Sequence, residues 1–137
     1  MKRTILFRGF NENLDKWIYG NLIVISEDIC FIENTKERIS VIPSSVGQFT
    51  GIFANKCKVF ENDIVNFGYK ENYPIVFSEN SEFVGFSDSR TGVNDIGGSF
   101  IGFVVLNYYN KNTSLELRED NNMIIVGNVY ENPELIL

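Results

Sequence analysis

Short runs of strand-forming residues, each closed by turn formers, recur about every ten residues along this 137-residue chain. The runs at 3–10, 17–26, 29–33 and 38–42 are separated only by brief polar turns. No window sustains the i, i+3, i+4, i+7 apolar spacing of an amphipathic helix. The sequence therefore predicts a mainly β fold of short antiparallel strands with little helix.

The second half of the chain continues the same pattern. Residues 57–69 predict two strands around a tight turn at 61–63, which would make 59–65 a hairpin. Residues 74–78 and 82–86 predict another hairpin, and the apolar run 100–109 predicts a central strand buried on both faces. Residues 87–99 read as the most loop-like segment and 123–130 as the last strand. Pro43 reads as the start of a single helical turn, and the tail closes with a short turn after Pro133.

The size and composition fit one globular unit. Hydrophobic residues make up 44% of the chain and charged residues 22%, which is close to globular averages. Without an internal repeat or a linker, we expect one compact domain over residues 1–137. The strand spacing suits a small barrel or sandwich, and the acidic turn leading into Asp63 is typical of SH3-like barrels.

Charge and missing residue types exclude several function classes. The net charge is −6, which disfavours nucleic-acid binding because basic groups supply most of that affinity. There is no histidine, so Ser-His-Asp and Cys-His catalysis are excluded. We predict no catalytic residue, metal or cofactor. Lacking an apolar leader or membrane span, the chain is expected to be cytoplasmic, with Cys30 and Cys57 reduced and buried.

Two stretches of the first half carry candidate binding residues. Arg8 stands among aromatic residues and suits either a phosphate or an internal contact, with Trp17 or with a carboxylate such as Glu131. In "GQFTG", Gln48 and neighbouring amides could hold an anion. The favoured interpretation is a kinked strand in which Phe49 enters the core and Gly47 and Gly51 permit close backbone approach.

Three further candidates lie nearer the C-terminus. Asp63 ends a turn, where it either contacts a partner or bonds backbone amides. Tyr130 and Glu131 lie in "GNVYENP", and Glu131 together with Glu134 just after it offers carboxylates for acid–base or metal chemistry. The favoured interpretation of that segment is a turn that ends the last strand before Pro133.

Five ordered motifs span nearly the whole chain: "ILFRGF", "WIYGNLI", "VGQFTG", "VFENDIV" and "VGNVYENPELI". In order and spacing they resemble the YopX family of bacteriophage and prophage proteins. The family's D-K-N-G-K turn is replaced here by "FANKCK", and the Gly of its E-G-D turn by Asn62. Asn tolerates the left-handed conformation best among non-Gly residues, so the second turn should survive. The resemblance implies a β-rich phage or prophage protein in the bacterial cytoplasm and implies no reaction.

Three hypotheses stay open on these observations. The favoured one is a non-catalytic interaction or regulatory module that contacts a host or phage protein, or its own copies as a homo-oligomer. The second is a nucleic-acid-binding barrel with Arg3, Arg8, Lys56 and Lys58 on its rim. The third is a small enzyme that uses the carboxylates of Asp63 and Glu131.

Overall fold

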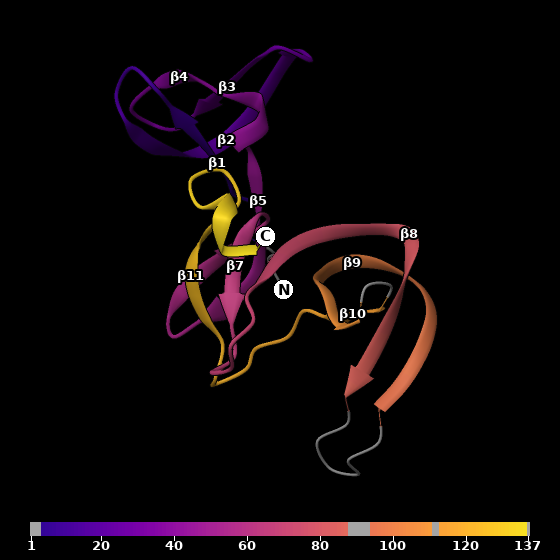
Figure 1. Cartoon of the computed structure of the whole chain (residues 1–137). Coiled ribbons are helices and arrows are strands. Elements are labelled where there is room, and N and C mark those ends of the chain that lie inside the picture. Colours follow the sequence, from indigo (N-terminus) through magenta and orange to yellow (C-terminus); the bar gives the residue numbers. More distant parts are fainter. Residues whose placement is uncertain (1–3, 88–93, 111–112, 137) are drawn as a thin grey trace. The chain divides into compact units, whose positions relative to one another are not determined.

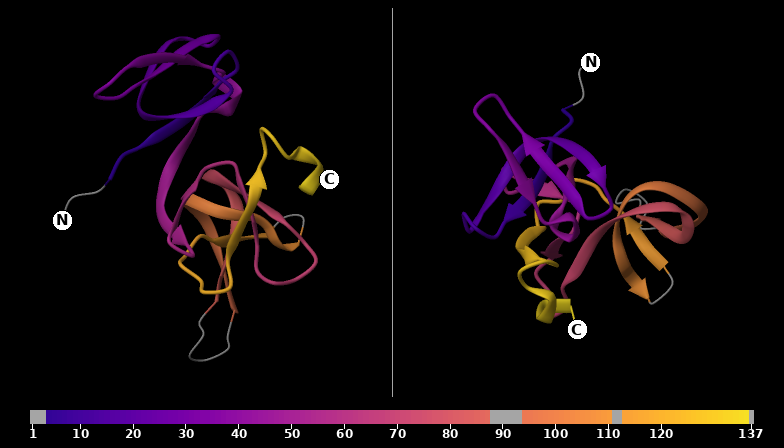
Figure 2. Two further views of the ribbon diagram at one scale, coloured as in Figure 1. Left: turned by 90° about the vertical axis from the view of Figure 1, so that its left-hand side faces the viewer. Right: turned by 90° about the horizontal axis from the view of Figure 1, so that it is seen from above.

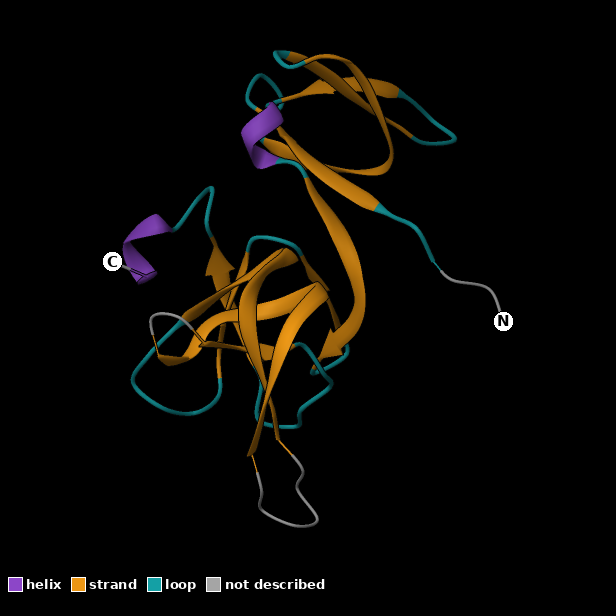
Figure 3. Ribbon diagram, turned by 90° about the vertical axis from the view of Figure 1, so that its right-hand side faces the viewer, coloured by secondary structure: helices purple, strands orange, loops and turns teal. Residues whose placement is uncertain are grey.

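The fold is built almost entirely from strands (Figure 3). The computed structural model describes residues 4–87, 94–110 and 113–136. Its strands are β1 (Phe7–Asn11), β2 (Lys16–Ser26), β3 (Ile29–Glu33), β4 (Arg38–Val41), β5 (Gly47–Ala54), β6 (Cys57–Phe60), β7 (Asp63–Asn66), β8 (Tyr73–Ser87), β9 (Asn94–Asn110), β10 (Thr113–Glu116) and β11 (Ile124–Asn128). Two 3₁₀ turns, η1 (Pro43–Ser45) and η2 (Pro133–Ile136), lie at the two expected positions. The mainly β prediction is confirmed.

The strands form two sheets, with orders β4-β3-β2-β1-β5-β6 and β10-β9-β8-β7-β11. Within the described residues these sheets stay open and do not close into a barrel. The chain divides into two compact units, Met1–Gly51 with Lys58–Phe60, and Ile52–Cys57 with Glu61–Leu137. One domain over residues 1–137 stays a prediction.

The first unit is a meander with a well-defined inner face. Successive side chains of a strand point to opposite faces, so β3 sends Cys30 and Ile32 inward. They form the core with Ile18 of β2 and Val41 of β4. Gly9 is needed where β1 meets this core, because a Cβ there would lie 2.6 Å from a methyl group of Val41.

Polar side chains fix the turns of this meander. Ser45 of η1 accepts a hydrogen bond from the Phe10 N–H at 2.8 Å and donates one to the Ile42 carbonyl at 2.6 Å. Asn11 donates from Nδ2 to the Ser40 carbonyl at 2.8 Å, and its Oδ1 accepts from the Leu14 N–H at 2.7 Å. The ends of β1 and β4 are thereby joined around η1.

The expected hairpin over residues 59–65 is wrong. β6 lies at the edge of the first sheet beside β5, whereas β7 lies between β8 and β11 in the second sheet. Asn62 makes the turn between them with a φ of +73°, the left-handed conformation expected for it. Its N–H donates to the Ile75 carbonyl at 2.7 Å and its carbonyl accepts from the Val129 N–H at 2.8 Å. The turn therefore connects two sheets and bonds to two segments of the second unit.

The second unit is dominated by the long antiparallel ribbon of β8 and β9, which curve together in Figures 1 and 2. The predicted hairpin with its turn at 79–81 is wrong, since β8 runs through this polar stretch as one strand with an irregular register. β9 lies between β8 and β10 and buries Val104 and Val105, so the predicted central strand is confirmed. The core also contains Ile64, Ile75 and Met123.

Two predictions concern regions at the limits of the described chain. The loop expected at 87–99 lies outside the described residues over 88–93, and from Asn94 onward the chain is already β9. Arg3 also lies outside the described residues. In the part of the chain that is described, no helix has the length and apolar character needed to cross a membrane.

Candidate interaction surfaces

Arg8 is the centre of an aromatic cluster in the first unit. Its guanidinium carbon lies 4.7 Å from the ring centroid of Trp17 and 4.9 Å from that of Phe60, within the range of a cation–π contact. Phe10 packs edge-on against Trp17, with 5.3 Å between centroids. The predicted contact between Arg8 and Trp17 is confirmed. Arg8 is 8% exposed, so it is placed for packing more than for capturing a phosphate from solvent.

Phe49 and Gln48 belong to β5 beside this cluster. Phe49 is buried, and its ring centroid lies 5.7 Å from that of Phe60, which confirms that it enters the core. Gln48 lies opposite Phe7 in the pairing of β5 with β1. The close approach expected at Gly51 is wrong, because a Cβ there would meet nothing within 4 Å. Its φ of +86° explains the glycine instead.

The candidates nearer the C-terminus come together around β11. Asp63 is 2% exposed and lies opposite Asn128 in the pairing of β7 with β11. Asn128 donates from Nδ2 to the Glu131 carboxylate at 3.0 Å, and its Oδ1 accepts from the Glu131 N–H at 2.8 Å. The Asn132 Oδ1 accepts from the Asn128 N–H at 3.2 Å. These bonds support the interpretation of a turn that ends the strand and contains Tyr130.

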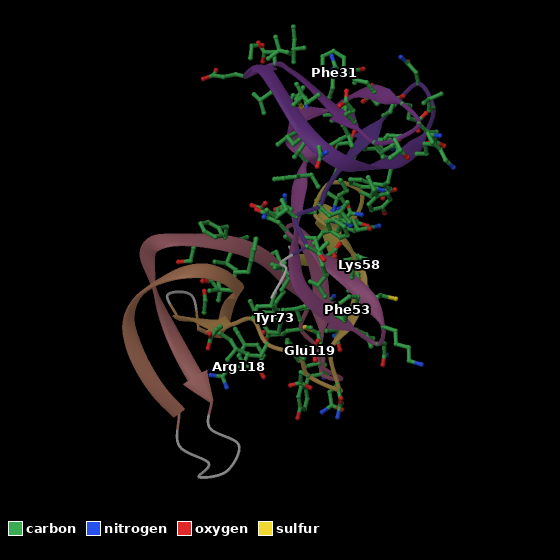
Figure 4. The ribbon with its side chains drawn as sticks, turned by 180° about the vertical axis from the view of Figure 1, so that it is seen from behind. Phe31, Phe53, Lys58, Tyr73, Arg118 and Glu119 are labelled. Carbon is green, nitrogen blue, oxygen red and sulfur yellow. The ribbon has the colours of Figure 1, made fainter. Side chains whose placement is uncertain are left out.

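One partly exposed apolar face of the first unit was not among the sequence-predicted sites; its Ile29 is exposed, and its Ile23 and Phe31 are half-buried. Ile23 of β2 and Phe31 of β3 are directly paired and lie on the face opposite Cys30 and Ile32. Ile29 follows on the same face of β3 and is 49% exposed. We call Ile23, Ile29 and Phe31 the outer patch; Figure 4 shows Phe31 standing out from its strand.

Two further exposed apolar residues lie at the end of the β2–β3 hairpin and are not part of the outer patch, since Val24 pairs with Cys30 of the inner face and Ile25 lies at the register shift. Val24 and Ile25 are each 64% exposed there, and the register shifts between Val24 and Ser26. The sequence did contain a signal for the outer patch. In "ICFIE" both alternating sets are apolar, although the inner face alone accounts for Cys30 and Ile32. Apolar residues on the outer face of a strand, as Ile29 and Phe31 are on β3, indicate a surface that binds a partner.

Comparison with known families gives one result over nearly the whole chain. The family model described as YopX protein matches residues 6–137. The chain belongs to the YopX family. The comparison with curated proteins gave no match. Membership is consistent with the five motifs, which in this YopX chain occupy β1, β2, β5, the turn between β6 and β7, and the end of β11.

The candidate cations of this YopX chain belong to both units, Lys56 to the second and Arg8 and Lys58 to the first. Lys56 occupies the turn between β5 and β6, beside an open hollow of about 540 Å³ that also contains Phe53, Glu119 and Asp120. Lys58 lies 6.0 Å from the ring centroid of Phe49 in the first unit. Figure 4 labels Phe53, Lys58 and Glu119 on their strands and turns. The carboxylates beside Lys56 counter its charge, so this hollow is a poor site for a phosphate.

The two thiols differ in environment. Cys30 is buried as expected, and its Sγ–H points to the Val41 carbonyl at 3.6 Å. Burial raises the pKa of the Cys30 thiol above its ordinary value. Cys57 is exposed, so its expected burial is wrong; it begins β6, an edge strand. Among the described residues no group of three Cys, Asp or Glu side chains is placed to hold a metal ion.

Proposed function

We propose that this YopX-family chain is a non-catalytic interaction module that binds a protein partner through the outer patch. We propose further that it is a phage or prophage protein acting in the bacterial cytoplasm, as its family resemblance implies. The observation that supports the binding role is an apolar sheet face on β2 and β3, where exposed Ile29 lies beside the half-buried pair Ile23 and Phe31.

This face has the properties of a protein contact. The directly paired Ile23 and Phe31 form an aromatic–β-branched pair, which makes a firm apolar platform. Scattered apolar side chains are normal on a surface, but a contiguous group on one sheet face is typical of an interaction site. Aromatic residues at the centre of such a group supply a large share of binding energy.

Charge supports a protein partner over a nucleic acid. The chain carries 12 Lys and Arg against 18 Asp and Glu. The turn beside the outer patch is formed by Glu27 and Asp28, both exposed. Carboxylates next to the apolar centre would repel a phosphate backbone and favour a partner surface that presents cations.

Affinity capture of the tagged chain from phage-infected or prophage-induced cells tests this function. Phe31→Asp should remove the specific partner, because it places a charge at the centre of the contact. Tyr69→Asp is the matched control, since Tyr69 is 78% exposed and lies in the second unit. A partner that survives nuclease, persists with Tyr69→Asp and disappears with Phe31→Asp is the expected result. Partners lost on nuclease treatment, or unaffected by Phe31→Asp, would contradict the proposal.

A further inference from the structure

The outer patch lies between the acidic β2–β3 turn and the β3–β4 turn, which holds Lys36. This difference in charge indicates which molecule would cover the patch. We propose that a second copy of the same chain covers the outer patch, in an antiparallel, two-fold symmetric contact between the two β2–β3–β4 faces. This inference rests on the proposed function, because it names the partner of that same surface.

One end of the patch is acidic. Glu27 and Asp28 form the turn between β2 and β3, directly before Ile29, and both are exposed. The Asp28 N–H donates to the Ser26 hydroxyl at 3.3 Å, which fixes the backbone of this turn. Among the described residues, neither carboxylate takes part in an ion pair. The turn therefore presents two uncompensated negative charges beside the apolar centre.

The other end carries a positioned cation. The turn between β3 and β4 is held by Asn34, whose Oδ1 accepts hydrogen bonds from the N–H groups of Lys36 and Glu37 at 2.9 and 3.1 Å. Asn34 also donates from Nδ2 to the Tyr19 carbonyl of β2 at 3.1 Å. Lys36 is exposed, and its charge together with that of Glu37 leaves this turn neutral overall.

A neighbouring ion pair limits the charge at that end. The Arg38 guanidinium lies 2.8 Å from the Glu33 carboxylate on the outer face of paired strands. This pair is neutral, so Lys36 is the cation available to a partner. The outer face therefore runs from two carboxylates, across Ile29 and Phe31, to a turn that holds Lys36.

Symmetry then selects one arrangement. Two identical sheet faces can meet only about a two-fold axis that lies in the plane of the contact. An axis along the strands would bring the Glu27–Asp28 turns of both copies together, placing four carboxylates at one end. An axis across the strands makes the two β3 strands antiparallel and places each acidic turn opposite Lys36 of the other copy. The second arrangement keeps the acidic turns apart, sets each beside Lys36 in a turn of no net charge, and buries Phe31 against the other copy's patch.

The size of the face sets the affinity to expect. Five residues at about 3.3 Å each make β3 about 17 Å long, and three strands spaced about 4.8 Å apart are about 14 Å wide. Such a face is smaller than the surface of about 800 Å² per partner in a standard interface. We therefore expect a weak dimer with a dissociation constant of about 10–100 µM.

Sedimentation velocity of the full chain over about 1–500 µM tests the dimer directly. The expected result is a shift from the 15.7 kDa monomer to twice that mass as concentration rises. Phe31→Asp should raise the dissociation constant at least about 20-fold, because a carboxylate at the symmetric centre would face its own copy. Tyr69→Asp should leave the constant unchanged.

Charge-swap variants test the antiparallel arrangement separately. The double change Glu27→Lys with Asp28→Lys should raise the dissociation constant about 5–10-fold, since it sets cations against Lys36. Lys36→Glu alone should raise it by a similar factor. All three changes in one chain should restore it to within about 2-fold of the wild type, because opposite charges again face each other. These exposed side chains should leave folding intact, which Trp17 fluorescence checks.

A single monomeric species up to about 500 µM would overturn this inference. So would a dimer that Phe31→Asp does not weaken, or a triple variant that stays as weak as Lys36→Glu. A monomeric chain whose captured partner still depends on Phe31 would overturn the dimer and leave the proposed function standing. A dimer sensitive to Phe31 in a chain whose other captured partners ignore Phe31 would support self-association as the role of the patch.

Discussion

Arg8 is a buried cation in contact with two aromatic rings, Trp17 and Phe60. A cation–π contact is worth about 2 kcal/mol when the cation is shielded from water, more than at an exposed site. Arg8 therefore contributes to the stability of the first unit and joins β1, β2 and β6 at one point. That role does not require a ligand.

We predict that Arg8→Met lowers the free energy of unfolding by about 2 kcal/mol, because methionine keeps the apolar stem and loses the cation. Urea denaturation followed by fluorescence measures this change, since Trp17 is the only tryptophan. Lys58→Met is the matched control and should change stability by less than about 0.5 kcal/mol, because Lys58 is exposed. Equal effects of the two changes would contradict the buried role of Arg8.

The two thiols should react at different rates. Burial raises the pKa of Cys30, so its reactive thiolate is scarcer at any pH below that value, whereas Cys57 is exposed. A thiol reagent at pH 8 should modify one cysteine per chain rapidly, and Cys57→Ser should abolish that fast phase. The second cysteine should react only on unfolding. Two fast thiols in the native chain would be inconsistent with this structure.

Some of these residue roles could be predicted from the sequence and others could not. The Arg8–Trp17 contact and the burial of Phe49 follow from strand alternation and from the tendency of half-buried arginines to stack on rings. The exposure of Cys57 depends on the place of β6 at a sheet edge, which local sequence does not encode. Ile29 and Phe31 read as ordinary strand residues until pairing assigns them to the outer face.

At the scale of elements, the close packing of β1 against β4 depends on Gly9. A side chain there would press on Val41 of β4. We predict that Gly9→Ala costs about 2 kcal/mol of stability by overpacking. Val41→Ala alone should cost about as much. The double variant should lose at least about 1 kcal/mol less stability than the two single losses added together, because Val41→Ala removes the methyl groups that the new Cβ at position 9 would overlap. Strictly additive losses in urea denaturation would refute this contact.

The loop between β7 and β8 depends on Asn66. Its Nδ2 bonds to the carbonyls of Tyr69 and Glu71 at 2.7 and 3.1 Å, and its Oδ1 accepts from the Gly68 N–H at 2.6 Å. We predict that Asn66→Ala raises amide hydrogen exchange over residues 67–72 at least about 10-fold, with exchange in β9 unchanged. Asn66→Asp should have a smaller effect, since it keeps the acceptor for Gly68. Unchanged exchange in the alanine variant would contradict this role.

The sequence predicted the ends of a strand correctly where short polar turns bound that strand. β3 begins and ends at the predicted residues and β2 within one residue, because polar turn formers bound both strands. The hairpin at 59–65 failed because a tight turn also suits a passage between sheets, and only long-range pairing distinguishes the two. The polar stretch at 79–81 looked like a turn, yet β9 pairs along much of β8 and keeps it extended.

At the scale of the whole molecule, the proposed function depends on one surface. The described residues form eleven strands in two compact units, and the outer patch lies on the first unit. The charge of −6 and the acidic turn beside the patch favour association with a protein surface that offers cations. Strand composition predicted the fold class, whereas the patch emerged only from the pairing of β2 with β3. Membership of the YopX family adds no chemistry to this account.

The most direct test of the central claim is site-specific photocross-linking in cells that contain the chain. A benzophenone side chain at Ser40, which is exposed and paired with Phe31, should give a discrete cross-linked protein product. The same group at Tyr69 should not, and Phe31→Asp should remove the product from position 40. Mass spectrometry then identifies the product as a second copy or another protein. No product at position 40, or one that ignores Phe31→Asp, would contradict the outer patch as the surface through which this chain acts.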